Sequence, residues 1–406
     1  MVELQNAALV VHPGTQHAPS LAAQLQRRGM LGRYWTGFAI RDEGLMGRVV
    51  GALSDSLRGR LSGRVVRGLP ASKLRLRFLA EVRALAQFRG GVNPQLVMRA
   101  RNAAFQLSVP HLEIERCEVV IGFDTSAWLL GERAKEQGKR FILDQTTTHS
   151  RSKESRLALA REQYPEWVED LIPRERSVAL EEEREHELAD LIVVASSYAR
   201  STMVDGGVPA RKIVVNPYGV DLDRFRPAEQ RRADRALRFL FVGSVNARKG
   251  APLLFDAWRE LEPTGAELVI AGDAPRQVER LLGTHRGIRF LGRVSKDQIP
   301  SLMRSCDILV LPSYFEGFGM VLLEALASGL PIIASDTSAA PDLLSSAQAG
   351  VVFRSGEVGG LRDAINRLQT APEQVREMGT EARRVAERYS WDAYGDRWAA
   401  LLEGAR

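Results

Sequence analysis

Cysteine is scarce in this chain, which has only Cys117 and Cys306 among its 406 residues. Each stands beside an apolar, strand-like run and far from the other, so we expect buried free thiols rather than a disulfide or a metal site. No stretch approaches the ~18 apolar residues of a membrane-spanning helix. The apolar run at residues 7–11 ends at His12 and Pro13, too soon for a signal peptide. These absences predict a cytosolic protein that is neither exported nor inserted in a membrane.

Positive charge is unevenly distributed along the chain. Between Arg41 and Arg101, twelve arginines and one lysine stand against four acids, so this segment carries +9 whereas the whole chain carries +6. Because aromatic residues are sparse there and no recognition motif accompanies the charge, we do not expect nucleic acid as a partner. One helical face of the segment is apolar and consists of Phe78, Leu79, Val82 and Leu85. This pattern indicates either an amphipathic helix packed on the core of the first domain or a peripheral contact with an anionic membrane surface.

The second half of the chain alternates short apolar runs with helical patterns, which is typical of parallel βαβ units. Strands are predicted at residues 237–242, 267–271, 288–291, 308–311, 331–334 and 350–353. Helices are predicted at residues 252–261, 277–282, 298–304 and 361–368. This order indicates a doubly wound α/β sheet.

The first half shows the same alternation of strands and helices less clearly. Its predicted strands are residues 7–11, 119–123, 141–144, 191–195 and 213–215, and its clearest helices are 19–28 and 126–137, the second capped by Asp124. A chain of this length, 45% apolar, exceeds the usual size of one domain. We therefore predict two Rossmann-like domains, residues 1–222 and 236–388, joined by a polar linker at 223–235. Residues 389–406 are expected to form a helix that crosses back to the first domain.

Two carboxylates, Glu316 and Glu324, are separated by a glycine turn and the start of an apolar helix that Gly329 and Pro331 bound. If the helix begins near Gly319, Glu324 lies roughly two turns into it and Glu316 lies on the loop at its mouth. One cavity can then hold both acids. The loop glycines let backbone N–H groups approach a ligand, and a helix N-terminus suits phosphate. A sugar joined to a diphosphate needs this combination of hydroxyl-binding acids and an anion site.

Basic residues follow the first predicted strand of the second half. Gly243 and Ser244 end that strand, and Arg248 and Lys249 open the next helix. Ligands of open α/β sheets bind beyond the carboxyl ends of the strands. We therefore expect Lys249, with Arg248, to neutralise a departing diphosphate rather than to serve as solvated surface charge.

A glutamate, seven residues and a second glutamate, here Glu316 and Glu324, form the signature of a large family of nucleotide-sugar-dependent enzymes. The chain resembles this family, the retaining glycosyltransferases of family 4, which have the GT-B fold. The match extends to Asn216-Pro-Tyr-Gly-Val-Asp221, Gly243, Lys249-Gly250 and Leu291-Gly-Arg-Val294. The resemblance covers about half of the chain strongly and the first half through its order of elements.

The resemblance implies a role for each motif. Residues 1–222 would bind the acceptor and residues 236–388 the nucleotide sugar. Glu324 would hold the ribose hydroxyls, and Glu316 the hydroxyls of the donor sugar. The backbone of Gly317, Phe318 and Gly319 would hold the sugar and its phosphate. Lys249 would bind the diphosphate, and the backbone near Val294 would flank the nucleobase.

Two departures from the family pattern affect the donor site. The family often has an arginine where this chain has Ser244, and Arg248 is expected to supply the missing charge. The family also commonly has a glycine pair after the first strand, where this chain has His12-Pro-Gly14-Thr-Gln-His17. We expect Gly14 alone to replace the glycine pair in donor binding. We expect His12 and His17 to line the acceptor cleft.

His149 follows the strand at 141–144, where family members tend to carry an active-site histidine. The resemblance therefore implies that His149 positions the sugar, as a catalytic residue beside Glu316 and Lys249. It also implies retention, with the leaving phosphate taking the acceptor's proton, so no carboxylate nucleophile is named. Neither a metal nor a cofactor is expected, and the absence of an Asp-x-Asp motif agrees with that. The acidic residues 181–187 predict only a solvated helix face.

These observations together predict an enzyme that moves a hexose from a nucleotide diphosphate sugar to a hydroxyl of a glycan or lipid-linked acceptor. Cell-surface polysaccharide or glycolipid synthesis is the expected setting, in the cytoplasm or at the inner face of the membrane. Two alternatives remain open. One is an inactive GT-B module that binds anionic glycans or partners, which Ser244 favours. The other is a GT-B enzyme of different chemistry, such as a sugar-nucleotide epimerase or a phosphorylase.

Overall fold

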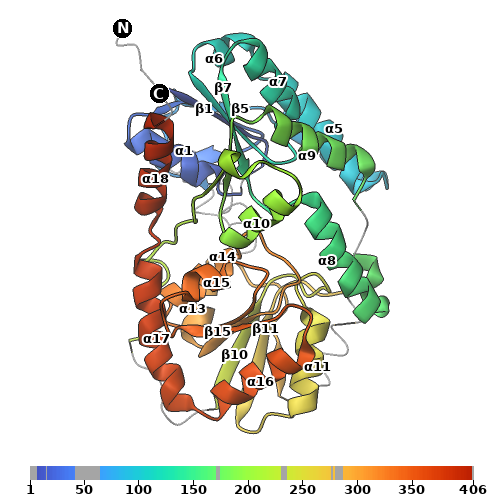
Figure 1. The fold of residues 1–406 in the computed structure, drawn as a ribbon, viewed down its shortest axis with the longest axis vertical. Coiled ribbons are helices and arrows are strands. Elements are labelled where there is room, and N and C mark those ends of the chain that lie inside the picture. The colour runs from blue at the N-terminus through green and yellow to red at the C-terminus, as the bar shows by residue number, and fades with distance from the viewer. Residues whose placement is uncertain are drawn as a thin grey trace.

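The computed structural model describes residues 7–14, 16–41, 65–170, 174–229, 236–275, 278 and 287–404. It consists of two α/β lobes stacked along the long axis of the molecule, and the last two helices run along one edge of both lobes (Figure 1). Each lobe is built on its own parallel sheet, so the predicted doubly wound α/β class is confirmed.

The first lobe contains a seven-stranded parallel sheet with the order β5-β2-β1-β6-β7-β8-β9. Its strands are β1 (Ala8–His12), β2 (Leu31–Thr36), β5 (Leu74–Leu76), β6 (Val119–Phe123), β7 (Arg140–Gln145), β8 (Leu191–Val194) and β9 (Ile213–Val215). The helices of this lobe are α1 (Ala18–Arg27), α4 (Leu79–Arg89), α5 (Pro94–Leu107), α6 (His111–Glu115), α7 (Trp128–Glu136), α8 (Ser150–Gln163), α9 (Arg176–Leu188) and α10 (Ser197–Asp205). The central strands β1 and β6 are buried along their whole length, as apolar strands covered on both faces are.

The second lobe contains a six-stranded parallel sheet with the order β12-β11-β10-β13-β14-β15. Its strands are β10 (Leu237–Val242), β11 (Ala266–Ala271), β12 (Ile288–Phe290), β13 (Ile308–Leu311), β14 (Ile332–Ser335) and β15 (Gly350–Phe353). Its helices include α11 (Ala251–Leu261), α13 (Ile299–Arg304), α14 (Met320–Ala327), α15 (Ala340–Leu344) and α16 (Val358–Gln369). The helix predicted at residues 277–282 lies almost entirely outside the described residues.

The chain passes between the lobes twice, and the two passages lie side by side. The second passage joins α17 (Pro372–Glu387), which packs on α14, to α18 (Trp391–Glu403), which packs on α1 (Figure 1). The backbone N–H of Val220 donates to the carbonyl of Tyr389 at 2.9 Å. Arg397 donates to the side chain of Asn216 at 2.6 Å and to the carbonyl of Pro217 at 2.9 Å. The motif at residues 216–221 therefore holds the two passages together.

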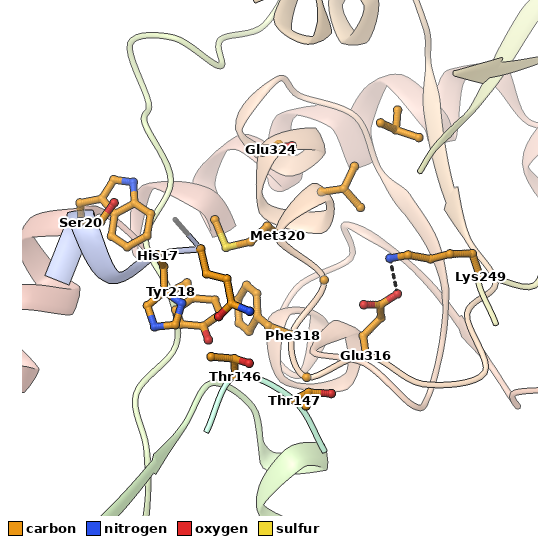
Figure 2. Close-up of a pocket in the computed structure, with 16 residues that line it drawn as sticks. His17, Ser20, Thr146, Thr147, Tyr218, Lys249, Glu316, Phe318, Met320 and Glu324 are labelled. Atoms are coloured by element: carbon orange, nitrogen blue, oxygen red, sulfur yellow. Dashed lines mark hydrogen bonds and ion pairs between the residues drawn. The ribbon is translucent and has the colours of Figure 1, made fainter. Parts of the chain in front are cut away.

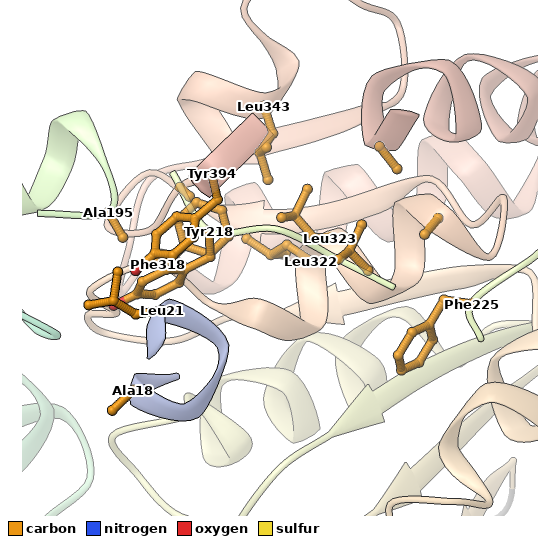
Figure 3. Close-up of a cluster of buried hydrophobic side chains, with 14 of the residues drawn as sticks. Ala18, Leu21, Ala195, Tyr218, Phe225, Phe318, Leu322, Leu323, Leu343 and Tyr394 are labelled. Carbon is orange, nitrogen blue, oxygen red and sulfur yellow. The ribbon is translucent and has the colours of Figure 1, made fainter. Parts of the chain in front are cut away.

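One apolar cluster joins the lobes beneath this double passage. It contains Leu21 of α1, Tyr218 of the first passage, Phe318 from the loop before α14, and Tyr394 of α18 (Figure 3). All four side chains are at most 6% exposed. Because large aromatic side chains contribute strongly to packing energy, this cluster gives the lobes a defined mutual position.

The interpretation of residues 181–187 as a solvated face is wrong. Glu182 is fully buried in α9, pairs with Lys153 at 3.2 Å and Arg174 at 2.8 Å, and accepts a hydrogen bond from Gln145. Glu185 is fully buried too and accepts the backbone N–H groups of Thr125 and Ala127 at 2.7 Å each. Buried acids need such partners, and here they tie α9 to α8 and to the loop after β6.

Asp124 does not cap α7 as predicted. The residue at the N-cap position is Ala127, which provides no side-chain hydrogen bond. The Asp124 carboxylate instead accepts the backbone N–H of Thr146 at 2.9 Å and the Thr146 hydroxyl at 2.6 Å. It therefore fixes the loop that follows β7.

The helix predicted from the apolar stripe near residue 80 exists as α4, but its apolar face is not packed on the first domain. Phe78 is 55% exposed, Leu79 75% and Val82 57%. The helix packs against α5 and buries Ala84. The prediction that the apolar face packs on the core of the first domain is therefore wrong for Phe78, Leu79 and Val82. Residues 42–64 of the basic segment and the side chain of Leu85 lie outside the described residues.

Cys117 and Cys306 are buried free thiols, as expected. Within the described ranges, no helix is both long enough and apolar enough to cross a bilayer.

Candidate active site

Glu316 lies on the loop that follows β13, and three polar side chains surround its carboxylate. Lys249 donates to Glu316 Oε1, Ser313 Oγ donates to the same oxygen at 2.8 Å, and Arg248 Nη1 lies 3.5 Å from it. Burial alone would raise the pKa of Glu316, but the Lys249 and Arg248 charges outweigh burial and hold that pKa below its usual value. Glu316 is therefore a carboxylate that two cations stabilise.

The backbone around Gly250 explains how Lys249 reaches Glu316. Gly250 has φ 70°, and a Cβ there would lie 1.9 Å from the carbonyl oxygen of Pro312, so only glycine fits. This contact presses the loop after β10 against the end of β13. The side chain of Asn246 accepts the backbone N–H of Lys249 at 2.9 Å, and Tyr314 N–H donates to the carbonyl of Arg248 at 2.9 Å. Arg248 thus reaches the same carboxylate as Lys249, from the loop where Ser244 replaces the arginine of the family pattern.

The glycine turn meets the first lobe directly. A Cβ at Gly317 would lie 2.2 Å from the carbonyl oxygen of Thr146 and 2.7 Å from Thr147 Cα, on the loop after β7. Ser196, from the N-cap of α10, donates its hydroxyl to the carbonyl of Gly317 at 2.6 Å. The lobes are therefore in contact at this turn, and no side chain fits between them.

Glu324 lies on α14, whose N-cap is Gly319 with φ 89°. The helix begins at Met320, so Glu324 is its fifth residue and lies just over one turn in, not two turns as predicted. Burial raises the pKa of the Glu324 carboxyl to about 7, and the charges of Arg224 and Lys296 offset this only in part. Perturbed carboxyl groups of this kind gather at functional sites.

Glu316, Glu324 and Lys249 line a single cavity of about 540 Å³ between the lobes (Figure 2). The second lobe also contributes Gly317, Phe318 and Gly319 to the lining, together with Val242, Met320 and Val321. The other lining residues are Gln16, His17, Ser20, Thr146, Thr147, Tyr218 and Trp391. The cavity has the size of a small-molecule site and lies beyond the carboxyl ends of β1, β7, β10 and β13, where open α/β sheets bind ligands.

Four predicted donor residues lie outside this lining, and one of them, Arg248, contacts it through Glu316. Gly243 is next to it, because a Cβ there would come within 3.8 Å of the Lys249 side chain. Val294 is on the loop that carries Lys296, whose charge lowers the pKa of Glu324. Gly14 packs against the ring of His12, and its carbonyl accepts the Thr36 hydroxyl at 3.2 Å. The structure therefore brings six predicted donor residues into the cavity and leaves these four at or beyond its edge.

His149 does not line the cavity. It is the N-cap of α8, where its Nδ1 accepts the backbone N–H of Arg151 at 3.2 Å. Its ring is 2% exposed and packs against Gly206 and the ring of His186. Burial lowers the pKa of His149, so the neutral form is favoured. The expectation that His149 acts on the sugar is not supported by this geometry, because helix capping turns its imidazole toward backbone.

His17 lines the cavity instead, and it bonds to a buried acid. Its Nε2 lies 2.8 Å from Asp144 Oδ2, and the two side chains are 8% and 3% exposed. The sequence placed His17 and Asp144 only generally on the acceptor side, and it did not predict their contact. Only their positions in the sequence could have indicated this site. His17 follows β1 and Asp144 is near the end of β7, and the carboxyl ends of both strands face the cavity.

Sequence comparison agrees with this geometry. The model of the family "Glycosyl transferases group 1" matches residues 223–385, which include Lys249, Glu316 and Glu324. Residues 223–385 of the chain belong to this family. It is 30% identical over 294 residues to D-inositol 3-phosphate glycosyltransferase 2 of Catenulispora acidiphila, covering 66% of each chain.

A second relative is the GDP-mannose-dependent alpha-(1-6)-phosphatidylinositol monomannoside mannosyltransferase of Mycobacterium tuberculosis. This group 1 protein is 29% identical to it over 238 residues, which cover 53% of the chain and 62% of the relative. The chain spans somewhat less than two thirds of the length of these curated relatives.

Solved structures identify the fold of this group 1 family member as GT-B, as expected. Sucrose-phosphate synthase from Thermosynechococcus elongatus superposes with a TM-score of 0.66 at 16% identity, covering 98% of this chain and 99% of the other. Anabaena HepE in complex with UDP and glucose gives a TM-score of 0.65 at 15% identity, covering 98% and 100%.

Proposed function

We propose that the protein transfers a hexose from a nucleotide diphosphate sugar to a hydroxyl of a glycan or lipid-linked acceptor, with retention of the anomeric configuration. The observation that carries the proposal is that Glu316, Glu324 and Lys249 line one interlobe cavity. Family membership supports glycosyl transfer as the reaction class. The UDP and glucose bound by Anabaena HepE support a nucleotide diphosphate sugar as the donor.

Each cavity residue has a place in this proposal. Glu324 accepts hydrogen bonds from the ribose hydroxyls, and Glu316 accepts them from the donor sugar, because ionised carboxylates are pure acceptors. Lys249 and Arg248 stabilise the negative charge that develops on the departing diphosphate. The proposal therefore needs neither a metal ion nor a cofactor. The backbone from Gly317 to Gly319 binds the sugar and its phosphate at the start of α14. Gly243 borders the phosphate, and the backbone near Val294 flanks the nucleobase.

The acceptor side of the proposal rests on the relatives. One acts on D-inositol 3-phosphate, and the other acts on a phosphatidylinositol monomannoside. A hydroxyl of a glycan or lipid-linked acceptor, in cell-surface polysaccharide or glycolipid synthesis, is therefore the acceptor class we propose. It would enter from the first lobe, which contributes Gln16, His17, Ser20, Thr146 and Thr147 to the cavity.

The deciding experiment is incubation of the protein with a panel of UDP-, GDP- and ADP-sugars, followed by mass spectrometry of the products. We expect slow hydrolysis of one donor to its nucleoside diphosphate and free sugar. An inactive GT-B module would release neither product. An epimerase would change the sugar while it remains attached to the nucleotide.

We further propose that α4 holds the protein on an anionic lipid bilayer. The exposed Phe78, Leu79 and Val82 form an apolar face, and the exposed Arg77 and Arg83 stand beside it. An amphipathic surface of this composition inserts its apolar residues at the headgroup boundary while the arginines meet anionic lipid. A lipid-linked acceptor would then be presented to the first lobe at the surface where it resides.

Vesicle co-sedimentation tests the membrane proposal. Binding to phosphatidylglycerol vesicles should exceed binding to phosphatidylcholine vesicles and should weaken with salt, because exposed charges are screened. Replacing Leu79 and Val82 by serine should reduce it at least tenfold. Leu112→Ser, at a residue that is 50% exposed on α6, is the matched control and should bind as the wild type does. Binding that ignores lipid charge and survives the double substitution would contradict the proposal.

A further inference from the structure

The side of the interlobe cavity that the first lobe forms has neither lysine nor arginine among its described residues. It consists of Gln16, His17, Ser20, Thr146 and Thr147, and the two interlobe passages add Tyr218 and Trp391. These seven residues form the acceptor side of the cavity. In Figure 2, His17 and Ser20 lie on one side of the cavity and Lys249, the one lysine of the described lining, lies on the other. An acceptor that enters from the first lobe would therefore contact hydroxyl, amide and aromatic groups.

The start of α1, which lies on the acceptor side, is a poor site for an anion. Proteins bind phosphate groups mainly through arginine or lysine, or through free backbone N–H groups at the start of a helix. In the first turn of α1, Pro19 has no N–H group, and the N–H of Leu21 donates to the carbonyl of His17 at 3.0 Å. A phosphate placed here would lose its hydration without gaining a charged partner, which is unfavourable. The acceptor side therefore fits a neutral ligand better than a phosphorylated one.

The polar groups of the acceptor side are suited to hydroxyls. The side chains of Gln16, Ser20 and Thr147 line the cavity and make no hydrogen bond within the part of the chain that the structure describes. Each of them can both donate and accept hydrogen bonds, as the hydroxyl groups of a sugar can. A few polar groups placed in this way give a small-molecule site its specificity. The three side chains therefore provide partners for a ligand that is rich in hydroxyl groups.

Trp391 adds an apolar surface to the acceptor side. It is the first residue of α18, and its partly buried side chain lines the cavity. The ring of Tyr394 packs edge-on against it, with 5.3 Å between the ring centroids. Its backbone is fixed too, because a Cβ at Gly219 would lie 2.4 Å from the backbone nitrogen of Trp391. The C–H face of a saturated ring packs well on an aromatic side chain that is held in this way.

We propose that the acceptor unit that receives the sugar is a neutral, hydroxyl-rich ring, a pyranose or an inositol without a phosphate on the ring, and that this ring packs on Trp391. Its hydroxyl groups bond to Gln16, Ser20 and Thr147. The inference rests on the proposed function and names the acceptor of that same site. In a lipid-linked acceptor, the phosphate of the lipid lies outside the cavity, beyond the ring that reacts.

Matched pairs of probe acceptors test the charge of the ring. The pairs are octyl mannoside with its 6-phosphate and myo-inositol with D-inositol 3-phosphate, each incubated with a donor that the wild type hydrolyses. We expect kcat/KM for transfer to the neutral member of a pair to be about tenfold higher or more. Ser20→Lys puts a cation on the acceptor side and should reduce this preference by about fivefold or more. Ser155→Lys, at an exposed serine of α8 outside the cavity lining, is the matched control and should leave the preference unchanged.

Substitutions at Trp391 test the packing of the ring. Trp391→Ala should raise the KM of the neutral acceptor by about tenfold or more, whereas Trp391→Phe keeps an aromatic ring and should stay within about threefold of the wild type. The Kd of the donor, from calorimetry, should stay within about threefold of the wild type in both variants. A general loss of structure would instead weaken donor binding as well.

Three results would overturn the inference. One is a wild type that prefers the phosphorylated member of the pairs. Another is a wild type that hydrolyses a donor, while no neutral probe accepts its sugar or slows that hydrolysis. The third is an unchanged acceptor KM in a Trp391→Ala protein that binds the donor normally. If the wild type binds and hydrolyses no donor at all, the proposed function itself fails, which is a different result.

Discussion

The ammonium group of Lys249 and the carboxylate of Glu316 form an ion pair in the lining of the interlobe cavity. The two residues come from loops that follow different strands, β10 and β13, and both side chains are less than 20% exposed. Because the carboxylate is also near Arg248, two cations face one carboxylate and this part of the site carries excess positive charge. A diphosphate entering the cavity would therefore find one cation already oriented by Glu316.

Removing either member of this pair should affect different steps. Lys249→Ala leaves Glu316 with less compensating charge and removes a phosphate partner, so donor Kd should rise at least tenfold and kcat should fall. Glu316→Ala removes contacts to the sugar that strengthen as the bond to C1 breaks, so it should lower kcat by roughly 100-fold or more and change donor Kd little. Calorimetry and initial rates measure both. A large loss of donor affinity in Glu316→Ala with normal kcat would contradict the assigned role.

Donor binding should depend on pH through Glu324. Its pKa of about 7 means that the carboxyl is largely protonated at pH 6, and a protonated group accepts the paired ribose hydroxyls less well. The affinity of the wild type should thus fall as pH drops below 7, by up to tenfold per unit. Glu324→Gln should bind weakly at every pH, without this slope. A flat pH profile in the wild type would argue against Glu324 as the ribose ligand.

The same pKa has a consequence for stability, which serves as a control. The folded protein binds this proton more tightly than the unfolded chain, whose carboxyl has a pKa near 4.5. The stabilising contribution is therefore complete below pH 4.5 and is lost as pH rises to about 7. Glu324→Gln removes that loss, so its Tm at pH 8 should exceed that of the wild type, with a gain of at most about 3 kcal/mol. If the Tm difference between Glu324→Gln and the wild type is the same at pH 5 and pH 8, the pKa of Glu324 is not raised in the folded protein.

Gly317→Ala should separate the lobes. Its Cβ would overlap the backbone of Thr146 and Thr147, and backbone cannot yield as a flexible side chain can. We expect a loss of about 1–3 kcal/mol in stability, a larger radius of gyration by small-angle scattering, and a rise in KM together with a fall in kcat. Gly359→Ala, on the first turn of α16, would contact only the end of the Arg362 side chain and should be neutral or stabilising. A compact, fully active Gly317→Ala protein would refute the contact.

His149 should prove to be a structural residue. Asparagine is a strong N-cap, so His149→Asn should keep the start of α8 and retain activity within a few-fold, whereas His149→Ala should cost about 1 kcal/mol or more in stability. Thermal melts and donor hydrolysis test this. If His149→Asn melts as the wild type does and yet loses more than 100-fold in kcat, the histidine acts in catalysis after all.

Much of the second lobe is predictable because its strands are continuous apolar runs between clear turns. The predicted strands 237–242, 308–311 and 350–353 coincide with β10, β13 and β15. The first lobe is less predictable. Gly32, Arg33 and Thr36 interrupt the apolar residues of β2, so its sequence does not have the continuous apolar pattern of a buried strand. The sequence of α9 predicts solvated acids because it does not show that Glu182 pairs with Lys153 and Arg174. These two residues lie 29 and eight positions earlier in the chain.

In the candidate site, too, features that are local in the sequence were predictable and long-range contacts were not. Glu316, Glu324 and Lys249 were predictable because their spacing, glycines and helix boundaries are local features of the chain. The pairing of His17 with Asp144 was not, because 127 residues separate them and only the order of strands β1, β6 and β7 brings them together. The exposure of α4 was unpredictable for the same reason, since an apolar stripe does not show whether a partner surface covers it.

The most direct test of the central claim is titration of a panel of nucleotide sugars into wild-type protein and Glu324→Ala, with mass spectrometry of the reaction products. We predict that the wild type binds at least one donor and releases its nucleoside diphosphate, and that Glu324→Ala binds none. Equal donor affinity in the two proteins, or no binding by the wild type, would contradict the assignment of the interlobe cavity as a nucleotide-sugar site.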